Sequence, residues 1–311
     1  MAAERPAPSV TVVVPATDRP PTLGRCIAAV EGGNDPPEEL IVVTEPSGAG
    51  PATARNAGAV RASGEVLVFV DSDVVVRGDA LSLIRSAFTD PGLTATFGSY
   101  DDSPEAPDAV SGFRNLLHHH VHQSSGGRAS TFWAGLGAIR RTAFLEAGGF
   151  DDRSYRDASI EDIELGARLA AGGARIELEP GLQGTHLKAW TVREMVGTDF
   201  ARRAVPWVEL VLERRTGTRA LNLGWRNRLS VAAAVLAIGG AVTRHRRSAL
   251  AGALSLLALN SSFYGLLLRR RGPAQATAGF LLHMLHLAVG ALAVPVGLAA
   301  YLARGREVSG G

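Results

Sequence analysis

The chain has 311 residues and a net charge of +2, with 46% hydrophobic and 20% charged residues. At this length it can hold one sizeable domain and an appendage. Its single cysteine, Cys26, excludes an intrachain disulfide framework and Cys-based zinc sites. We therefore expect the main domain to function in a reducing cytoplasm.

Charge is distributed unevenly along the chain. Residues 1–228 carry 24 Lys and Arg against 29 Asp and Glu, whereas residues 229–311 carry eight Arg against the single acid Glu307. The second part is almost continuously apolar between its Arg clusters, which is typical of a membrane module rather than a nucleic-acid arm. We expect a membrane partner and no nucleic acid. Met1–Ser9 lacks an apolar h-region, so no signal peptide is expected.

The first 180 residues alternate strand and helix patterns. This alternation indicates an α/β fold with a mostly parallel sheet flanked by helices. Strands are predicted at Val10–Val14, Glu39–Val43, Glu65–Val70, Thr94–Gly98 and Arg175–Leu178, and helices at Thr22–Val30, Thr53–Ala62, Asp79–Phe88, Phe113–Gln123 and Ser159–Ala171. Between them, Ser124–Ser130 is predicted to be a flexible loop.

Residues 191–215 show apolar residues at helical spacing, interrupted by Pro206 and flanked by arginines. This pattern predicts amphipathic helices, which either lie in a membrane interface or pack on the soluble core. Three apolar stretches follow. Leu229–Thr243 is short for a membrane span, while Ser248–Leu268 and Thr277–Leu302 are long enough. Two or three spans fit, and the arginine clusters leave their topology open.

Two acids, Asp71 and Asp73, follow the buried strand Glu65–Val70. Residues two apart on a strand share a face, so both carboxylates can converge on one ligand. Ligands of open α/β sheets bind beyond the carboxyl ends of strands. A Mg²⁺ ion with a nucleotide diphosphate suits this position. The alternative is an Asp-rich turn or helix cap.

Five motifs occur in the order and spacing of family 2 glycosyltransferases, which the chain resembles from about Val10 to Trp207. The resemblance implies a GT-A fold with a Rossmann-like sheet, a nucleotide-sugar donor, Mg²⁺ or Mn²⁺, and inversion at the anomeric carbon. The motifs are Val12–Pro15, Ala54–Gly58, Phe69–Asp73, Gly148–Asp151 and Glu161–Asp162.

The apolar tail is similar to that of family members that glycosylate lipid carriers, which implies a lipid or polyprenyl-type acceptor. We expect a GT-A catalytic domain over residues 1–190, amphipathic interface helices over 191–228 and transmembrane helices over 229–311. The protein would then be a multi-pass protein of the cell membrane with its catalytic domain in the cytoplasm.

The resemblance assigns Asp73 to the metal, and Asp71 to the donor ribose or, through water, to the same metal. His186 would complete the metal site or touch the diphosphate, and as an imidazole it fits Mn²⁺ better than Mg²⁺. A structural histidine is the alternative. Lys188 is placed to meet phosphate charge.

Asp162 is the candidate general base, because an attacking hydroxyl must lose its proton and a carboxylate can take it. The alternative is local: Ser159-x-x-Asp162 matches a helix-capping pattern. The Gly148–Asp151 segment ten residues earlier favours catalysis. Glu161 would orient the acceptor or its neighbour.

The remaining candidates are donor-binding residues: Pro15, Thr17, Thr44, Glu45, Arg55, Asn56 and Trp133. Arg55 and Asn56 can reach ribose or phosphate, or form a helix-start ion pair. Trp133 can form a floor for a sugar or nucleoside, or belong to the core. Thr44-Glu45 stands where the family usually has an Asp pair, so the nucleotide stays open, with UDP as default and GDP allowed.

The cluster His118–His122 lacks the acid that zinc hydrolases require, so an interface or acceptor-side surface is the better interpretation. Two other functions were weighed against the glycosyltransferase. A nucleotidyltransferase usually has a Gly-rich basic loop after its first strand, but Ala16–Pro21 contains no glycine. A non-catalytic, membrane-tethered nucleotide-binding module is the second alternative.

Overall fold

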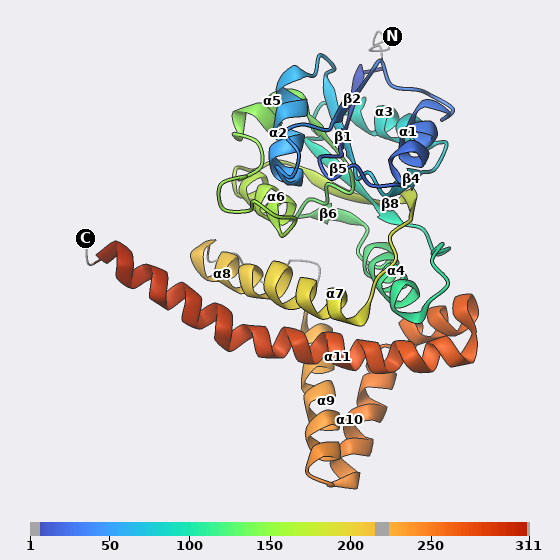
Figure 1. Cartoon of the computed structure of the whole chain (residues 1–311), viewed down its shortest axis with the longest axis vertical. Helices are drawn as coiled ribbons and strands as arrows, with labels where there is room; N and C mark the ends of the chain where they lie inside the picture. The colour runs from blue at the N-terminus through green and yellow to red at the C-terminus, as the bar shows by residue number, and fades with distance from the viewer. Residues whose placement is uncertain (1–6, 215–223, 310–311) are drawn as a thin grey trace. The chain divides into compact units, whose positions relative to one another are not determined.

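The computed structural model of the chain describes residues 7–214 and 224–309, with side chains described as far as Ala303. The chain divides into two compact units (Figure 1). The first consists of the residues up to Glu105 together with Val121–Lys188, and the second of Ala106–His120 together with the residues from Ala189 onward. The first unit is built around a sheet, and the second is helical.

The sheet of the first unit has eight strands in the order β2-β1-β3-β7-β5-β8-β4, with β6 paired to β8. The parallel pairings join β1 to β2 and β3, and β5 to β8. Strand β7 is antiparallel to β3 and β5, and β4 and β6 are antiparallel to β8. Five described strands therefore share one direction, which confirms the mostly parallel sheet. The bounds are β1 Val10–Pro15, β2 Glu39–Val43, β3 Val66–Val70, β4 Val74–Val76, β5 Ala95–Tyr100, β6 Gly127–Ala129, β7 Leu136–Arg140 and β8 Ile176–His186.

Both faces of the central strands are buried because helices cover them. Val12 and Val68 face a core shared with Cys26 and Ile84 of helices α1 and α3. On the other face, Phe69 packs against Phe144 and Phe150, with ring centroids 5.3 and 5.2 Å away. Continuous apolar runs such as Val66–Val70 arise from this double burial. The helices of this unit are α1 Leu23–Glu31, α2 Pro51–Arg61, α3 Ala80–Phe88, α5 Arg141–Glu146 and α6 Glu161–Ala171, and α4 Ala109–Gln123 contributes to both units.

Three strands and one extension were not predicted. These strands are β4, β6 and β7, of which β4 and β6 are short. β6 lies within Ser124–Ser130, where the prediction of a loop is therefore wrong. The last strand does not end at Leu178 but continues as β8 to His186, past Pro180 and Gly181. Proline and glycine usually end a strand, so the local pattern concealed the extension. His186 is thus the final residue of a strand rather than part of a following loop.

The second unit consists of part of α4 and the helices after Lys188. Its helix η1 is a π-helix, and α7 begins with a capping box between Thr191 and Glu194. In Figure 1 the α7–α8 segment lies alongside α11, and a Cβ added to Gly297 of α11 would lie 2.7 Å from Val208 of α8. The bounds are α7 Val192–Gly197, η1 Thr198–Ala204, α8 Val205–Arg214, α9 Trp225–Val242, α10 Arg246–Leu259 and α11 Ser261–Ser309.

The apolar stretches of the tail form helices with different breaks from those expected. Ser248–Leu268 is divided at Asn260, where α10 ends and α11 begins. Within α11, Gly272 has a φ of 76° and interrupts the helical backbone. By length and composition, one helix of the described residues, Ser261–Ala303, is apolar enough to cross a membrane. Residues 215–223 of the predicted interface segment lie outside the described residues.

Candidate active site

The candidate site lies at the carboxyl edge of the sheet, where β3 ends at Val70. Asp71 and Asp73 follow the strand in a short turn rather than belonging to it, and β4 begins at Val74. The turn is tied down by two backbone bonds: Asp71 N–H donates to Gly135 O at 3.1 Å, and Leu187 N–H donates to Asp73 O at 2.8 Å. The two carboxylates consequently have different partners.

Asp73 faces His186 because β4 pairs with β8. Val74 is the register partner of His186, and the Asp73 Oδ2 and His186 Nε2 atoms are 3.5 Å apart. Burial would raise the pKa of Asp73, but its contact with His186 and the charge of Lys188 outweigh burial and hold that pKa below its usual value. Asp73 is therefore ionised at neutral pH.

An aromatic stack fixes the His186 ring. The Tyr100 ring lies parallel to the imidazole, with a 4.3 Å centroid separation and a 9° interplanar angle. The Trp133 ring meets Tyr100 edge-on at 4.9 Å and His122 at 5.5 Å. Tyr100 was not among the predicted site residues. Its one sequence signal is its position as the last residue of a strand, at the edge where ligands of such sheets bind.

Arg55 of α2 joins Asp71 to the start of α6. Its Nη2 donates to Asp71 Oδ1 at 2.6 Å, and its Nη1 donates to Glu161 Oε1 at 2.9 Å. The Arg55 and Glu161 side chains are each 5% exposed, and that of Asp71 is 31% exposed. Burial and the neighbouring Asp73 charge together raise the pKa of Asp71 more than Arg55 lowers it. Asp71 retains one oxygen, Oδ2, outside this ion pair.

Asp162 is the second residue of α6 rather than its cap. The N-cap is Ile160, which makes no side-chain cap bond. The Asp162 carboxylate instead accepts from Ile163 N–H at 2.8 Å and from Ala134 N–H at 3.1 Å. Asp162 therefore binds one N–H of the first turn of α6 and one N–H of the distant residue Ala134.

Asp162 and Asp71 are anchored to neighbouring residues of one segment. Asp162 Oδ2 accepts from Ala134 N–H, and Asp71 N–H donates to the next residue, Gly135. Arg55 adds a second link, because it bonds both Asp71 and Glu161, the neighbour of Asp162. The acid pair after β3 and the acid pair of α6 therefore share one edge of the first unit.

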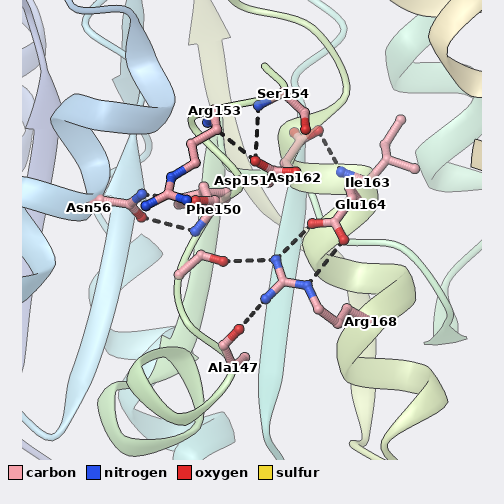
Figure 2. A network of polar contacts seen from close by, with 11 residues as sticks. Asn56, Ala147, Phe150, Asp151, Arg153, Ser154, Asp162, Ile163, Glu164 and Arg168 are labelled. Carbon is pink, nitrogen blue, oxygen red and sulfur yellow. Dashed lines mark hydrogen bonds and ion pairs between the residues drawn. The ribbon is translucent and has the colours of Figure 1, made fainter. Parts of the chain in front are cut away.

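Asn56 holds the Gly148–Asp151 loop. Its amide exchanges two hydrogen bonds with the backbone of Phe150, each 2.9 Å long (Figure 2). Gly148 and Gly149 have φ values of 79° and 72°, which favour glycine. Arg168 of α6 donates to Gly149 O at 2.8 Å and pairs with Glu164 at 2.7 Å. The structure thus gives Asn56 a loop-anchoring contact.

The other predicted donor-binding residues lie at or beyond the ends of β1, β2 and β8. Pro15 ends β1, and the carbonyl of the buried Thr17 accepts from Gly48 N–H at 3.3 Å. Thr44 and Glu45 follow β2, and the exposed Glu45 pairs with Arg19 at 2.5 Å. Lys188 is exposed, two residues beyond β8. These strands share one direction, so their ends share one edge with β3.

The side chains around Asp73 could coordinate a divalent cation only if a bound phosphate ligand and water complete its coordination shell. Asp73 offers oxygen, His186 offers nitrogen, and Asp71 keeps Oδ2. Within residues 7–214 and 224–309, no group of three or more His, Cys, Asp and Glu side chains is spaced to hold a metal by itself. Mg²⁺ or Mn²⁺ commonly takes one or two protein ligands and completes its shell with phosphate and water. The His118–His122 cluster has another use, because His122 Nδ1 bonds Gly98 O at 2.8 Å.

Comparison with known proteins identifies the family of this domain. Residues 33–147 match the family model described as Glycosyl transferase family 2. The pre-mycofactocin glycosyltransferases of two Mycobacterium tuberculosis strains, CDC 1551 / Oshkosh and ATCC 25618 / H37Rv, are each 27% identical over 217 residues, covering 60% of this chain. The match covers 45% of their length, so the chain spans less than half of these curated relatives.

The fold is that of GT-A glycosyltransferases. A solved mannosyltransferase from Pyrobaculum calidifontis, in complex with GDP-Man and Mn²⁺, superposes with a TM-score of 0.54 at 17% identity, covering 92% of this chain and 87% of that one. The match of residues 33–147 to the family 2 model and the GT-A fold confirm the predicted resemblance and fold. Glu161 and Asp162 lie beyond the matched segment.

Proposed function

We propose that this chain is an inverting, metal-dependent glycosyltransferase that moves a sugar from a nucleotide-sugar donor to a membrane-associated acceptor. The observation that carries the proposal is the shared edge: Asp71 and Asp73, inside the segment that matches the family 2 model, and Asp162, beyond that segment, are anchored to neighbouring residues of the first unit. An edge with the ionised Asp73 for a metal and a separate carboxylate for a proton suits transfer of a sugar from a diphosphate.

On the donor side, Asp73 and His186 would hold the cation, and Lys188 would meet the diphosphate. Mg²⁺ or Mn²⁺, when bound, supplies positive charge that stabilises the departing nucleoside diphosphate. Asp71, oriented by Arg55, has Oδ2 available for a ribose hydroxyl or a water. Pro15, Thr17, Thr44 and Glu45 would surround the nucleoside, and Trp133 would form a floor for the sugar or nucleoside.

On the acceptor side, Asp162 would take the proton of the attacking hydroxyl. Its two oxygens each accept one backbone N–H, from Ala134 and from Ile163, which orients the carboxylate. Glu161 is bound to Arg55 and to Ser159 N–H at 2.8 Å, so we propose that it orients Asp162 rather than the substrate. A single carboxylate acting as base is sufficient for one displacement, and one displacement inverts the anomeric carbon.

The test measures metal-dependent release of nucleoside diphosphate from a panel of UDP- and GDP-sugars, in membranes that contain the full chain. We expect release with Mn²⁺ or Mg²⁺ and its loss on chelation. Asp162→Asn should lower turnover at least about 100-fold, the range for loss of a general base. Asp73→Ala should raise the metal requirement. Asp90→Asn is the matched control, because exposed Asp90 pairs with Arg175 away from the site.

Several outcomes would contradict the proposal. Undiminished turnover in Asp162→Asn would remove that residue from the role of base. Release of pyrophosphate would indicate the nucleotidyltransferase, and metal-dependent nucleotide binding without any turnover would indicate a non-catalytic module. A product with retained anomeric configuration, read by NMR, would exclude inversion.

We further propose a lipid or polyprenyl-type acceptor at the cytoplasmic face of the cell membrane. The support is the helix Ser261–Ala303, apolar enough to cross a membrane, in the same chain. Polyprenyl phosphate is therefore the first acceptor to assay. Pre-mycofactocin is the second acceptor to assay, because the similar curated proteins are named pre-mycofactocin glycosyltransferases. Transfer to pre-mycofactocin alone would contradict the lipid acceptor and leave the donor chemistry intact.

A further inference from the structure

Helices α9 and α10 pack against each other through small residues. A Cβ added to Gly240 of α9 would lie 2.4 Å from Ala249 N, and one added to Gly252 of α10 would lie 2.5 Å from Ala237 N. The two backbones therefore approach so closely that only glycine fits at these two positions. Ala233, Ala234 and Ala237 are among the buried residues of α9. In Figure 1 the two helices form an antiparallel pair that projects away from α11.

Several large apolar side chains of this hairpin point outward, whereas Leu256 of α10 is buried. Val242 is 77% exposed, Leu250 61% and Leu254 55%. A hairpin in water would bury its large side chains and expose polar ones. Helices surrounded by lipid have this arrangement, with small residues between the helices and large apolar residues facing outward. Close van der Waals packing drives the association of such helices.

A buried polar pair closes the base of the hairpin. Asn260 Nδ2 donates to Ser230 Oγ at 2.9 Å and to Leu256 O at 3.0 Å, and both residues are at most 9% exposed. Hydrogen bonds of this kind between helices are common in membrane bundles. The base is also where Arg226 Nε donates to Leu259 O at 2.5 Å.

Cations mark both ends of the hairpin, an aromatic residue marks its base, and the sequence between the two ends is uncharged. At the base, Trp225 is 76% exposed and Arg228 lies over its ring at 5.2 Å. At the turn stand Arg244, Arg246 and Arg247. From Arg228 to Val242, where α9 ends, an α-helix rises about 21 Å at ~1.5 Å per residue. This length is shorter than the hydrocarbon layer of about 30 Å, and arginine side chains that extend toward headgroups, with local thinning of the bilayer, bridge the difference.

We infer that α9 and α10 form a hairpin that is inserted in the membrane and surrounded by the hydrocarbon of the bilayer. Its turn, Arg244–Arg247, lies in the headgroup layer opposite to Trp225–Arg228 and contacts anionic lipid phosphates there. Although α10 has only 14 residues, its arginines extend its reach. The inference rests on the packing of the hairpin and does not depend on the proposed enzymatic function.

The first experiment maps sidedness with the full chain in sealed proteoliposomes of phosphatidylethanolamine and phosphatidylglycerol. Single cysteines are introduced as Gly224→Cys, Leu236→Cys and Thr243→Cys, and labelled with a membrane-impermeant maleimide. The native chain, whose sole cysteine Cys26 is buried, gives the background. We expect Gly224→Cys and Thr243→Cys to label from opposite sides, and Leu236→Cys from neither. Labelling of Thr243→Cys from the same side as Gly224→Cys would overturn the inference.

The second experiment distinguishes lipid from water or a second copy of the chain. Leu254→Arg replaces an outward side chain near the middle of α10, and Leu145→Arg replaces a 39% exposed leucine of α5. An arginine in hydrocarbon is strongly unfavourable, whereas at a wetted surface it is tolerated. We expect Leu254→Arg to reduce the membrane-integrated fraction at least threefold and Leu145→Arg to leave it unchanged. Equal integration of both variants, or an inter-chain disulfide of Leu236→Cys in lipid, would contradict the hairpin.

Discussion

At the scale of single residues, Arg55 determines where two acids of the candidate site stand. Its guanidinium reaches Asp71 after β3 and Glu161 at the start of α6, and only 5% of its side chain is exposed. A planar guanidinium can donate in two directions at fixed spacing, which the point charge of lysine cannot do. We therefore interpret Arg55 as a positioning residue rather than a direct donor contact.

Arg55→Lys should consequently lower kcat about tenfold while changing the donor KM less than threefold. The thermal midpoint should fall only moderately, because one carboxylate keeps a cation. A donor contact would instead raise KM at constant kcat. Steady-state kinetics and a melting curve on the same preparation distinguish these results.

Removing the charge altogether has a larger effect on stability. Arg55→Met leaves buried Glu161 without its cation, and breaking a buried pair in this way costs about 3–5 kcal/mol. Adding Glu161→Gln should recover part of that loss but none of the activity. The free energy of unfolding from a denaturant titration provides the measurement, and full recovery of activity would contradict the positioning role.

Tyr100 acts on the metal side of the candidate site through His186. The parallel contact at 4.3 Å leaves the imidazole little rotational freedom beside Asp73. Tyr100→Phe preserves the stack, and we expect its Mn²⁺ affinity in the presence of nucleoside diphosphate to match that of the native chain. Tyr100→Leu should bind Mn²⁺ about tenfold more weakly, as read by EPR titration. Equal affinity of the two variants would show that the stack does not hold His186.

At the scale of elements, the position of helix α6 depends on the close approach of Gly166 to the backbone of residues 131 and 132. A Cβ on Gly166 would lie 2.2 Å from Phe132 N and 2.4 Å from Thr131 C, both backbone atoms. The same segment continues to Ala134, whose N–H binds Asp162. The position of the candidate base thus depends on how closely α6 approaches residues 131–134.

Gly166→Ala should therefore displace α6 and lengthen the Ala134–Asp162 hydrogen bond. We expect a loss of about 1–3 kcal/mol, the usual cost of overpacking, together with a lower kcat. Gly172→Ala is the control, because its added Cβ would meet Leu169 O at an ordinary 3.4 Å. Comparable stability and activity of the two variants would refute the close-packing argument.

At the scale of the whole molecule, the charge difference between the two parts of the chain predicts how the protein is held. The basic, apolar residues after Leu229 favour anchoring by hydrocarbon contact, with arginines at anionic headgroups. We expect the chain to stay with membranes in 1 M salt and at alkaline pH on the order of 11, and to be released by detergent, since salt screens only the electrostatic part. Release by salt alone, followed by immunoblot, would indicate peripheral attachment.

Much of the fold follows from local patterns. Val66–Val70 is apolar throughout and is a central strand buried on both faces, and Glu39–Val43 is a strand with the predicted bounds. In contrast, β7 contains Gly137 and Ala138 and has no alternation, so its insertion between β3 and β5 depends on long-range pairing. The break at Asn260 also depends on a distant partner, Ser230.

By itself the sequence determined the elements whose apolar periodicity is local, the charge asymmetry of the tail, and the acids that end β3 and begin α6. Only the tertiary structure decided their partners: Asp73 beside His186, Asp71 and Glu161 on Arg55, and Asp162 on Ala134. The physical reason is range. Hydrophobic periodicity is a property of neighbouring residues, whereas strand register and helix approach bring together residues far apart in the chain, and these contacts set the geometry of the site.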